Sequence, residues 1–282
     1  MTDTSALRNE GDPYLNQSMN AGTLKVPAAG AGILEVSSLS KAFGGLQVLY
    51  DISFSVTPGT IHAVIGPNGA GKTTFFNLAT GVYTPDSGRI LFEQREIQGR
   101  RVHELVARGI ARTFQNVELF ESLSVLENVL VGQYVRTRCG FWGALGRWPW
   151  VRREEREARE RAMALLEFVG LQDKAAQRSS DLPFGWQRLL EIARALAAQP
   201  LLLLLDEPAA GLNAVETQLL GELIQQIKAQ GTTVLLVEHD MSLTMEISDR
   251  LLVLDQGRKL AEGTAKEIQS NEKVMAAYLG KS

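Results

Sequence analysis

The sequence has 282 residues, of which 45% are hydrophobic, and its formal net charge is -3. This length predicts one or two domains with ample material for a packed core. The small net charge excludes the basic excess of a typical nucleic-acid-binding protein, so we expect no nucleic-acid partner. No stretch reaches the ~18 uninterrupted apolar residues of a spanning helix, so any role at a membrane requires a partner.

The N-terminal region, residues 1–31, is rich in Gly, Ala, Asn, Ser and Thr without periodicity, which predicts a disordered tail before an ordered domain at 32–282. Its first residues lack the apolar segment of a secretory signal, and the single Cys139 cannot form an internal disulfide. We therefore expect a soluble chain from a reducing compartment. Alternation over Ile52–Val56 predicts a half-buried strand, and Arg89–Ile97 predicts a hairpin.

The most informative stretch follows the apolar run Ile61–Ile65. It consists of Gly66, Pro67, Asn68, Gly69, Ala70, Gly71, Lys72, Thr73 and Thr74. A strand, a glycine-rich turn and a helix in this order form a phosphate cradle, because backbone N–H groups and the helix N-terminus converge on an anion. Lys72 supplies charge for the outer phosphates, and the Thr73 hydroxyl suits Mg²⁺. The chain is therefore expected to bind a nucleoside triphosphate.

The pattern changes between about residues 116 and 185, where a helical insertion is expected. Leu126, Val129 and Leu130 predict one helix, and Arg152–Val169 predicts a long charged one. Two oppositely charged pairs four residues apart lie along it, Glu155–Arg159 and Glu157–Arg161. The balanced signs favour a solvated helix face over a nucleic-acid patch. The aromatic stretch Phe141–Trp150 predicts either a partner surface or local packing.

Strands and helices alternate again after residue 185. The expected elements are helices at Trp186–Ala198 and Ala214–Ala229 and strands at Leu201–Leu205, Thr232–Val237, Leu251–Leu254 and Lys259–Ala261. This alternation predicts an α/β fold with a mainly parallel sheet, whose ligands lie at the carboxyl ends of the strands. Gly66, Asp206 and His239 each follow a strand, so we expect them along one edge.

Four residues near that edge are candidates for chemistry. Asp206 is expected to hold Mg²⁺ through water, and Glu207 to polarise a water for attack on the γ-phosphate. His239 is placed to reach the γ-phosphate from the end of the next strand. Gln115, at the junction with the helical insertion, can touch Mg²⁺ or water and move with the insertion.

These motifs together resemble the nucleotide-binding subunits of ATP-binding-cassette (ABC) transporters, from about Ile33 to the C-terminus. The matching segments are Walker A at Gly66–Thr74, the Q-loop at Gln115, the signature region at Leu182–Gln187, Walker B ending in Asp206-Glu207, the D-loop at Ala210–Asn213 and the switch His239. The resemblance implies a P-loop NTPase with a RecA-like core, an antiparallel β subdomain and a helical subdomain. It also implies binding of ATP and Mg²⁺ and hydrolysis of ATP.

The resemblance also implies roles for single residues. Phe43, upstream of the first predicted strand, matches the residue that stacks on adenine. Gly185 is implied to contact the ATP bound by an opposite subunit. Glu207, His239 and Gln115 are implied to be catalytic, and the implied metal ligands are Thr73, Gln115 and Asp206. The usual signature Leu-Ser-Gly-Gly-Gln is altered, since Pro183, Phe184 and Trp186 replace Ser, the first Gly and Gln, which predicts a weaker composite ATP site.

Other segments resemble the ATPase subunits of branched-chain amino-acid importers more closely. They are Gly109–Asn116, Asp206–Asn213, Glu238–Met241 and Ala277–Gly280, together with the aromatic stretch. This resemblance implies transmembrane subunits and a second ATP-binding subunit, identical or not, as partners. A solute-binding protein is implied as an indirect partner. The implied location is the cytoplasmic face of the inner membrane, as a peripheral subunit.

Three other functions were weighed against this one. A small-molecule P-loop kinase would not need Glu207, His239 or a signature region. A soluble ABC ATPase of translation or DNA repair usually carries two cassettes or a long coiled coil, which this sequence does not predict. The ATPase subunit of another transporter, such as an importer of another amino acid, amide or urea or a lipid exporter, stays an open alternative.

Overall fold

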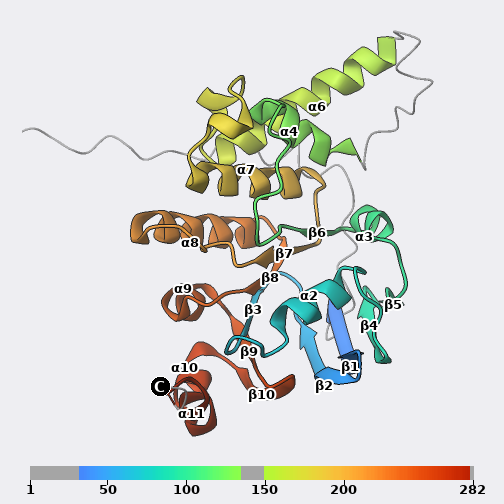
Figure 1. The fold of residues 1–282 in the computed structure, drawn as a ribbon. Helices are drawn as coiled ribbons and strands as arrows, with labels where there is room; N and C mark the ends of the chain where they lie inside the picture. The colour runs from blue at the N-terminus through green and yellow to red at the C-terminus, as the bar shows by residue number, and fades with distance from the viewer. Residues whose placement is uncertain (1–31, 135–148, 280–282) are drawn as a thin grey trace, which may run out of the picture.

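The central sheet is formed by hydrophobic strands whose residues are mostly buried, because other elements of the fold cover both faces of the sheet (Figure 1). The computed structural model describes residues 32–134 and 149–279, so the predicted tail and residues 141–148 of the aromatic stretch lie outside the described residues. Its strand order is β10-β9-β3-β8-β7-β6. These strands are β3 (Ile61–Ile65), β6 (Ile110–Arg112), β7 (Leu202–Asp206), β8 (Thr233–Val237), β9 (Arg250–Asp255) and β10 (Arg258–Gly263). β10 runs antiparallel to β9 at one edge, and the other neighbours in the sheet pair in parallel.

A second sheet is antiparallel, with the order β2-β1-β4-β5. Its strands are β1 (Leu34–Phe43), β2 (Leu46–Val56), β4 (Ser87–Phe92) and β5 (Arg95–Glu96). The sequence pattern does not predict β1, because register shifts and a left-handed residue at Ser38 (φ 51) interrupt its alternation. The expectation that Phe43 lies ahead of the first strand is therefore wrong, since Phe43 is the last residue of β1.

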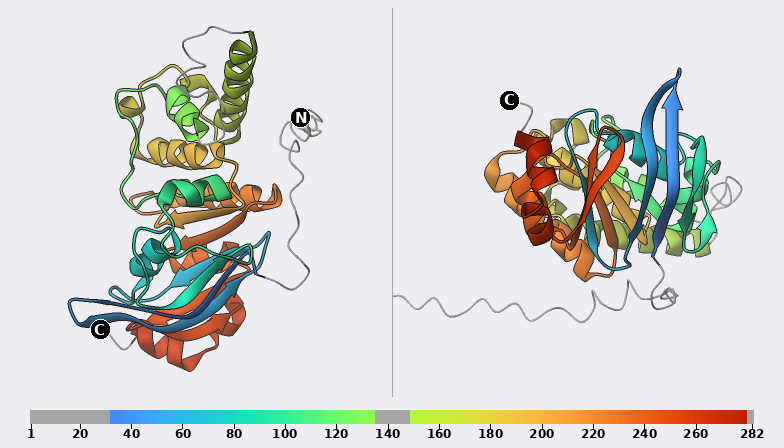
Figure 2. Two further views of the ribbon diagram at one scale, coloured as in Figure 1. Left: turned by 90° about the vertical axis from the view of Figure 1, so that its right-hand side faces the viewer. Right: turned by 90° about the horizontal axis from the view of Figure 1, so that it is seen from below.

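Helices cover both faces of the central sheet, which confirms the predicted α/β class (Figure 2). Their bounds are α2 (Lys72–Ala79), α3 (Val102–Arg108), α4 (Val125–Gly132), α6 (Pro149–Phe168), α7 (Phe184–Ala197), α8 (Ala214–Ala229), α9 (Met241–Ile247), α10 (Ala265–Gln269) and α11 (Glu272–Leu279). The helix α8 has the predicted bounds because Asn213 caps it, accepting the N–H groups of Val215 and Glu216. None of the described helices is long and apolar enough to cross a membrane.

Helices α4, α6 and α7 pack on one another at the opposite end of the molecule from the antiparallel sheet (Figures 1 and 2). Two ion pairs on α6 join Arg153 to Glu157 at 2.8 Å and Arg156 to Glu160 at 3.8 Å. Because α6 is helical over all four residues, Glu155 and Arg159 share a face, as do Glu157 and Arg161, which confirms the predicted placement. The Glu157 carboxylate accepts a hydrogen bond from Arg153, one turn earlier.

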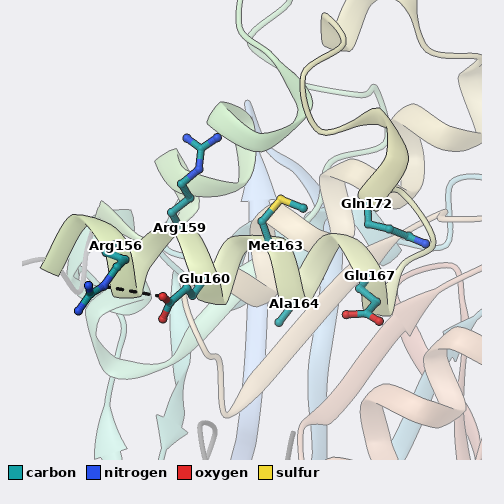
Figure 3. Close-up of a pocket in the computed structure, with 7 residues that line it drawn as sticks. All are labelled: Arg156, Arg159, Glu160, Met163, Ala164, Glu167 and Gln172. Atoms are coloured by element: carbon teal, nitrogen blue, oxygen red, sulfur yellow. Dashed lines mark ion pairs between the residues drawn. The ribbon is translucent and has the colours of Figure 1, made fainter. Parts of the chain in front are cut away.

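A shallow groove runs along the outer face of α6 (Figure 3). It is lined by Arg156, Arg159, Glu160, Met163, Ala164, Glu167 and Gln172. These residues belong to the helical layer, whereas the predicted phosphate-binding residues follow strands of the central sheet. The groove is therefore separate from the predicted nucleotide site. The proposed division of the chain at residues 116–185 stays a prediction.

Candidate nucleotide site

The phosphate loop joins β3 to α2 and requires glycine at two places. Gly66 has a φ of 155°, and a Cβ there would lie 2.1 Å from the carbonyl oxygen of Leu254. Gly71 has a φ of 98°, and its Cβ would lie 2.5 Å from Cδ2 of Leu49. The loop thus approaches β9 and β2 so closely that a side chain at either position would displace it. Both sheets therefore fix the shape of the loop.

Lys72, the first residue of α2, is buried beneath this loop. Its Nζ donates to the carbonyl oxygens of Gly66 at 2.7 Å and Pro67 at 3.1 Å. Burial lowers the pKa of Lys72, while the nearby carboxylates of Glu207 and Asp206 oppose that shift. The ammonium is therefore held at the loop, next to two acidic groups, where an anion would meet it.

Gln115, Glu207 and His239 meet at the carboxyl edge of the central sheet. Gln115 Nε2 donates to Glu207 Oε2 at 2.9 Å, and His239 Nε2 lies 2.8 Å from Glu207 Oε1. Glu207 follows β7 with a left-handed backbone (φ 48), while its N–H donates to the carbonyl of Val237 at 2.9 Å. Both carboxylate oxygens are thus engaged by side chains that follow two different strands.

Asp206, the last residue of β7, is bound by an arginine to which the sequence analysis assigns no role. Arg112 donates to Asp206 Oδ2 at 2.6 Å, to Asn77 Oδ1 at 2.7 Å and to Thr80 Oγ1 at 2.9 Å. Both side chains of the ion pair are buried. Arg112 therefore ties Asp206 to the C-terminal part of α2, the helix that begins at Lys72. Its place beside the predicted Q-loop was the available sequence signal.

Glu238 is a second residue without a role in the sequence analysis. Its buried carboxylate accepts the N–H of Ala209 at 2.6 Å and the N–H of His239 at 2.9 Å. Burial raises the pKa of Glu238, although these backbone hydrogen bonds oppose the shift. The segment that follows Glu207 and the segment that carries His239 are thus joined through one side chain.

Phe43 and Gly185 lie outside this cluster of residues. The Phe43 ring packs edge-on against Tyr83, with centroids 5.1 Å apart, and is 41% exposed. Gly185 is buried at the start of α7, where a Cβ would lie 2.7 Å from Oε1 of Glu216 on α8. Within one chain, the signature region packs on α8 rather than on the phosphate loop.

The oxygen donors near the loop fit Mg²⁺. The predicted set offers the Thr73 hydroxyl, the Gln115 amide oxygen and the Asp206 carboxylate, and Arg112 occupies one oxygen of that carboxylate. Among the described residues, no group of three or more His, Cys, Asp or Glu side chains is arranged to hold a metal. A few hard oxygen donors beside a phosphate cradle suit Mg²⁺, which keeps several waters and takes the rest of its ligands from phosphates.

The helix α11 reaches back to the phosphate loop. The phenol of Tyr278 lies close to the backbone of Gly66, which opposes part of a rise in the pKa of this phenol. Burial raises the pKa of Tyr278 to about 12, and the Asp255 carboxylate adds to this shift. The first glycine of the loop is therefore held by a residue from the last helix of the structure.

Comparison with known proteins agrees with this geometry. The sequence family described as "ABC transporter" matches residues 49–210, and the family described as "Branched-chain amino acid ATP-binding cassette transporter" matches residues 258–282. A crystal structure of a nucleotide-free ATP-binding cassette from an ABC transporter superposes with a TM-score of 0.77 and 34% identity, covering 88% of this chain and 99% of the other. A cassette in its ADP conformation gives the same values.

The fold and site therefore define an ATP-binding cassette, and the chain belongs to the ABC transporter family of ATPases. The high-affinity branched-chain amino acid transport ATP-binding protein LivG of Escherichia coli is 45% identical over 251 residues, covering 89% of this chain and 98% of LivG. BraF of Pseudomonas aeruginosa, which bears the same description, is 46% identical with the same coverage. A probable LivG of Archaeoglobus fulgidus is 38% identical, over 88% of this chain and 95% of the relative.

Proposed function

We propose that the chain is the ATPase subunit of an importer of branched-chain amino acids. The similarity to LivG and BraF supports this substrate class, as does the family match over residues 258–282. The observation that carries the catalytic part is the position of Glu207 between Gln115 and His239, at 2.9 and 2.8 Å. A carboxylate with two hydrogen-bonding neighbours beside a phosphate loop suits activation of a water.

In the proposed mechanism, Lys72 and the N–H groups of the loop bind the outer phosphates of ATP. A water takes the place of one hydrogen-bonding neighbour of Glu207. Glu207 accepts a proton from this water while the water oxygen attacks the γ-phosphorus. The bond from that phosphorus to the bridging oxygen breaks, and ADP departs with the electron pair. His239 and Gln115 orient the water and the γ-phosphate. Thr73, Gln115 and Asp206 would hold Mg²⁺, which would supply positive charge beside the phosphate oxygens.

The proposal places a second ATP-binding subunit against the start of α7. Phe184 and Trp186 are 47% and 40% exposed there, which suits a surface that closes on another cassette. Gly185 and the N-terminus of α7 would then face the ATP of that subunit, while Phe43 would stack on adenine in this one. The further partners are transmembrane subunits, with a solute-binding protein acting through them. The chain would lie peripherally on the cytoplasmic face of the inner membrane.

Uptake of labelled solutes tests the proposal in cells whose only copy of the chain carries Glu207→Gln. The panel holds leucine, isoleucine, valine, other amino acids and urea, and the control is the exposed substitution Glu246→Gln. Selective loss of branched-chain uptake is the expected result. Loss of uptake of a different solute would change the assigned substrate but would still support a role in a transporter. Unchanged uptake of every solute would contradict an importer and favour a lipid exporter.

A further inference from the structure

Two charged side chains on α7 are completely buried in the helical layer. Arg188 and Glu191 each retain 1% of their side-chain exposure, and their charged ends lie 3.1 Å apart. Burial raises the pKa of Glu191, with Arg188 and the Phe114 N–H opposing that shift. Charged groups are costly to bury, and apolar side chains of similar volume often stabilise a fold as well or better. Packing alone therefore does not account for this pair.

The pair binds the backbone on both sides of the bond between Phe114 and Gln115. Arg188 donates to the carbonyl oxygen of Phe114 at 2.7 Å and to that of Gln115 at 2.8 Å. Glu191 accepts the N–H of Phe114 at 3.0 Å. Three backbone groups of the Q-loop are thus fixed by one ion pair. The Gln115 side chain is left free to reach Glu207 at 2.9 Å.

The same arginine also contacts the beginning of α7. The Arg188 guanidinium lies 5.7 Å from the centre of the Phe184 ring. That ring packs on Gly211, where a Cβ would lie 3.0 Å from Phe184 Cε1. A continuous set of contacts therefore runs from the signature region through Arg188 to Gln115 and Glu207.

We infer that Arg188 and Glu191 form a positioning clamp that sets Gln115 against Glu207 and links its position to the start of α7. The inference rests on the proposed role of Gln115 in hydrolysis. A shift of the signature region would move Arg188 and, with it, the Gln115 backbone. The hydrogen bonds of the clamp join Arg188 and Glu191 to each other and to the Q-loop backbone. The clamp acts on turnover only through Gln115, and this can be measured.

The test is a double-mutant cycle of ATPase kinetics with Arg188→Lys and Gln115→Ala. Lysine keeps the charge beside Glu191 but lacks the planar fork that reaches two carbonyl oxygens. We expect Arg188→Lys to lower kcat about tenfold with unchanged KM, because hydrogen bonds to a charged donor are lost. In the Gln115→Ala background, the same substitution should lower kcat less than twofold. Arg159→Lys, at an exposed arginine of α6, is the control and should leave kcat unchanged.

Each other outcome overturns the clamp. An equal fall of kcat in both backgrounds would show that Arg188 supports the fold in general. An unchanged kcat in Arg188→Lys would contradict the positioning role of Arg188 and Glu191 while leaving the role of Gln115 intact. If Gln115→Ala itself leaves kcat unchanged, the role of Gln115 fails and the clamp fails with it. Should Arg188→Lys melt below the assay temperature, Glu191→Gln replaces it in the same cycle with the same criteria.

Discussion

The segments that follow β6 and β8 each bring one side chain to Glu207, but they are anchored in different layers. His239 is held by Glu238, whose other bond goes to Ala209 just beyond β7, so its anchor lies within the central sheet. Gln115 is held by Arg188 and Glu191 of α7, so its anchor lies among the helices. The contact of His239 with Glu207 therefore depends on the central sheet alone. The contact of Gln115 with Glu207 depends on the position of the helical layer.

Because of this difference, the contacts of His239 and Gln115 with Glu207 respond differently to a movement of the helical layer. The His239 contact keeps its geometry as long as the sheet is intact. The Gln115 contact keeps its geometry only while α7 holds its place on the sheet. We therefore expect His239 to serve the chemistry in every state of the molecule. We expect the contact between Gln115 and Glu207 to change when the helical layer moves.

The largest effect is expected at the carboxylate that both contacts share. Glu207→Gln removes the proton acceptor that Gln115 and His239 share, so kcat should fall by at least about 10²-fold. Binding of ATP should be retained, because the phosphate loop and Lys72 are untouched. ATPase assays and equilibrium binding of a fluorescent ATP analogue measure the two quantities, with Glu246→Gln as the control. Retained hydrolysis would remove Glu207 as the base.

A smaller effect is expected from the anchor within the sheet. Glu238→Gln turns one acceptor into an amide donor facing a backbone N–H, which costs about 1.5–3 kcal/mol and should lower kcat by about 10- to 10²-fold. Because the two anchors lie in different layers, the effects of Glu238→Gln and Arg188→Lys should multiply. Steady-state kinetics of the double variant checks this. A double variant no worse than either single one would mean that the two segments share one anchor.

Acidification should weaken the sheet layer through His62 on β3. Burial, reinforced by Arg250, lowers the pKa of His62 to about 4, from an ordinary 6.5. Between these values the unfolded chain binds the proton more readily, so stability is fully present above the unfolded pKa and is lost as the pH falls. The expected loss is about 2 kcal/mol between pH 7 and pH 5. Urea unfolding should show a smaller loss in His62→Gln, whereas the exposed His103→Gln should match the parent.

The smallest effect is expected at the start of α7. Pro183 is the N-cap of α7 and has no side-chain cap. Pro183→Ser adds a hydroxyl that can cap the helix or reach the ATP of a second cassette, worth about 1 kcal/mol in either case. ATP-dependent dimer formation, followed by light scattering, should shift to lower ATP concentration in the second case. A gain in thermal stability with no such shift would assign the whole effect to the cap.

The phosphate loop and most strands of the central sheet were open to sequence reasoning because each depends on neighbours in the chain. Gly66–Thr74 carries its own turn and helix start, and the apolar run at β7 requires covered faces. The α/β class followed from these local signals. The edge that gathers Gly66, Asp206 and His239 followed from the parallel sheet.

Partners distant in sequence could not be found in that way. Arg112 and Glu238 each sit beside a predicted site residue, but their hydrogen bonds reach Asn77 and Ala209 across the fold. No local pattern in the sequence distinguishes Arg188 from other charged helix residues. Only the packing of α7 against the Q-loop makes it a buried donor. β1 was hidden by its bulges, which break the alternation that marks a strand.

The closeness of Tyr278 to Gly66 has a consequence for the order of synthesis. Gly66 leaves the ribosome long before Tyr278, so a nascent chain can form its phosphate loop only without this phenol contact. The contact arises when α11 has been translated and has docked on the loop. A chain released or cleaved ahead of α11 would carry every residue of the Walker A segment, yet its loop would lack one support.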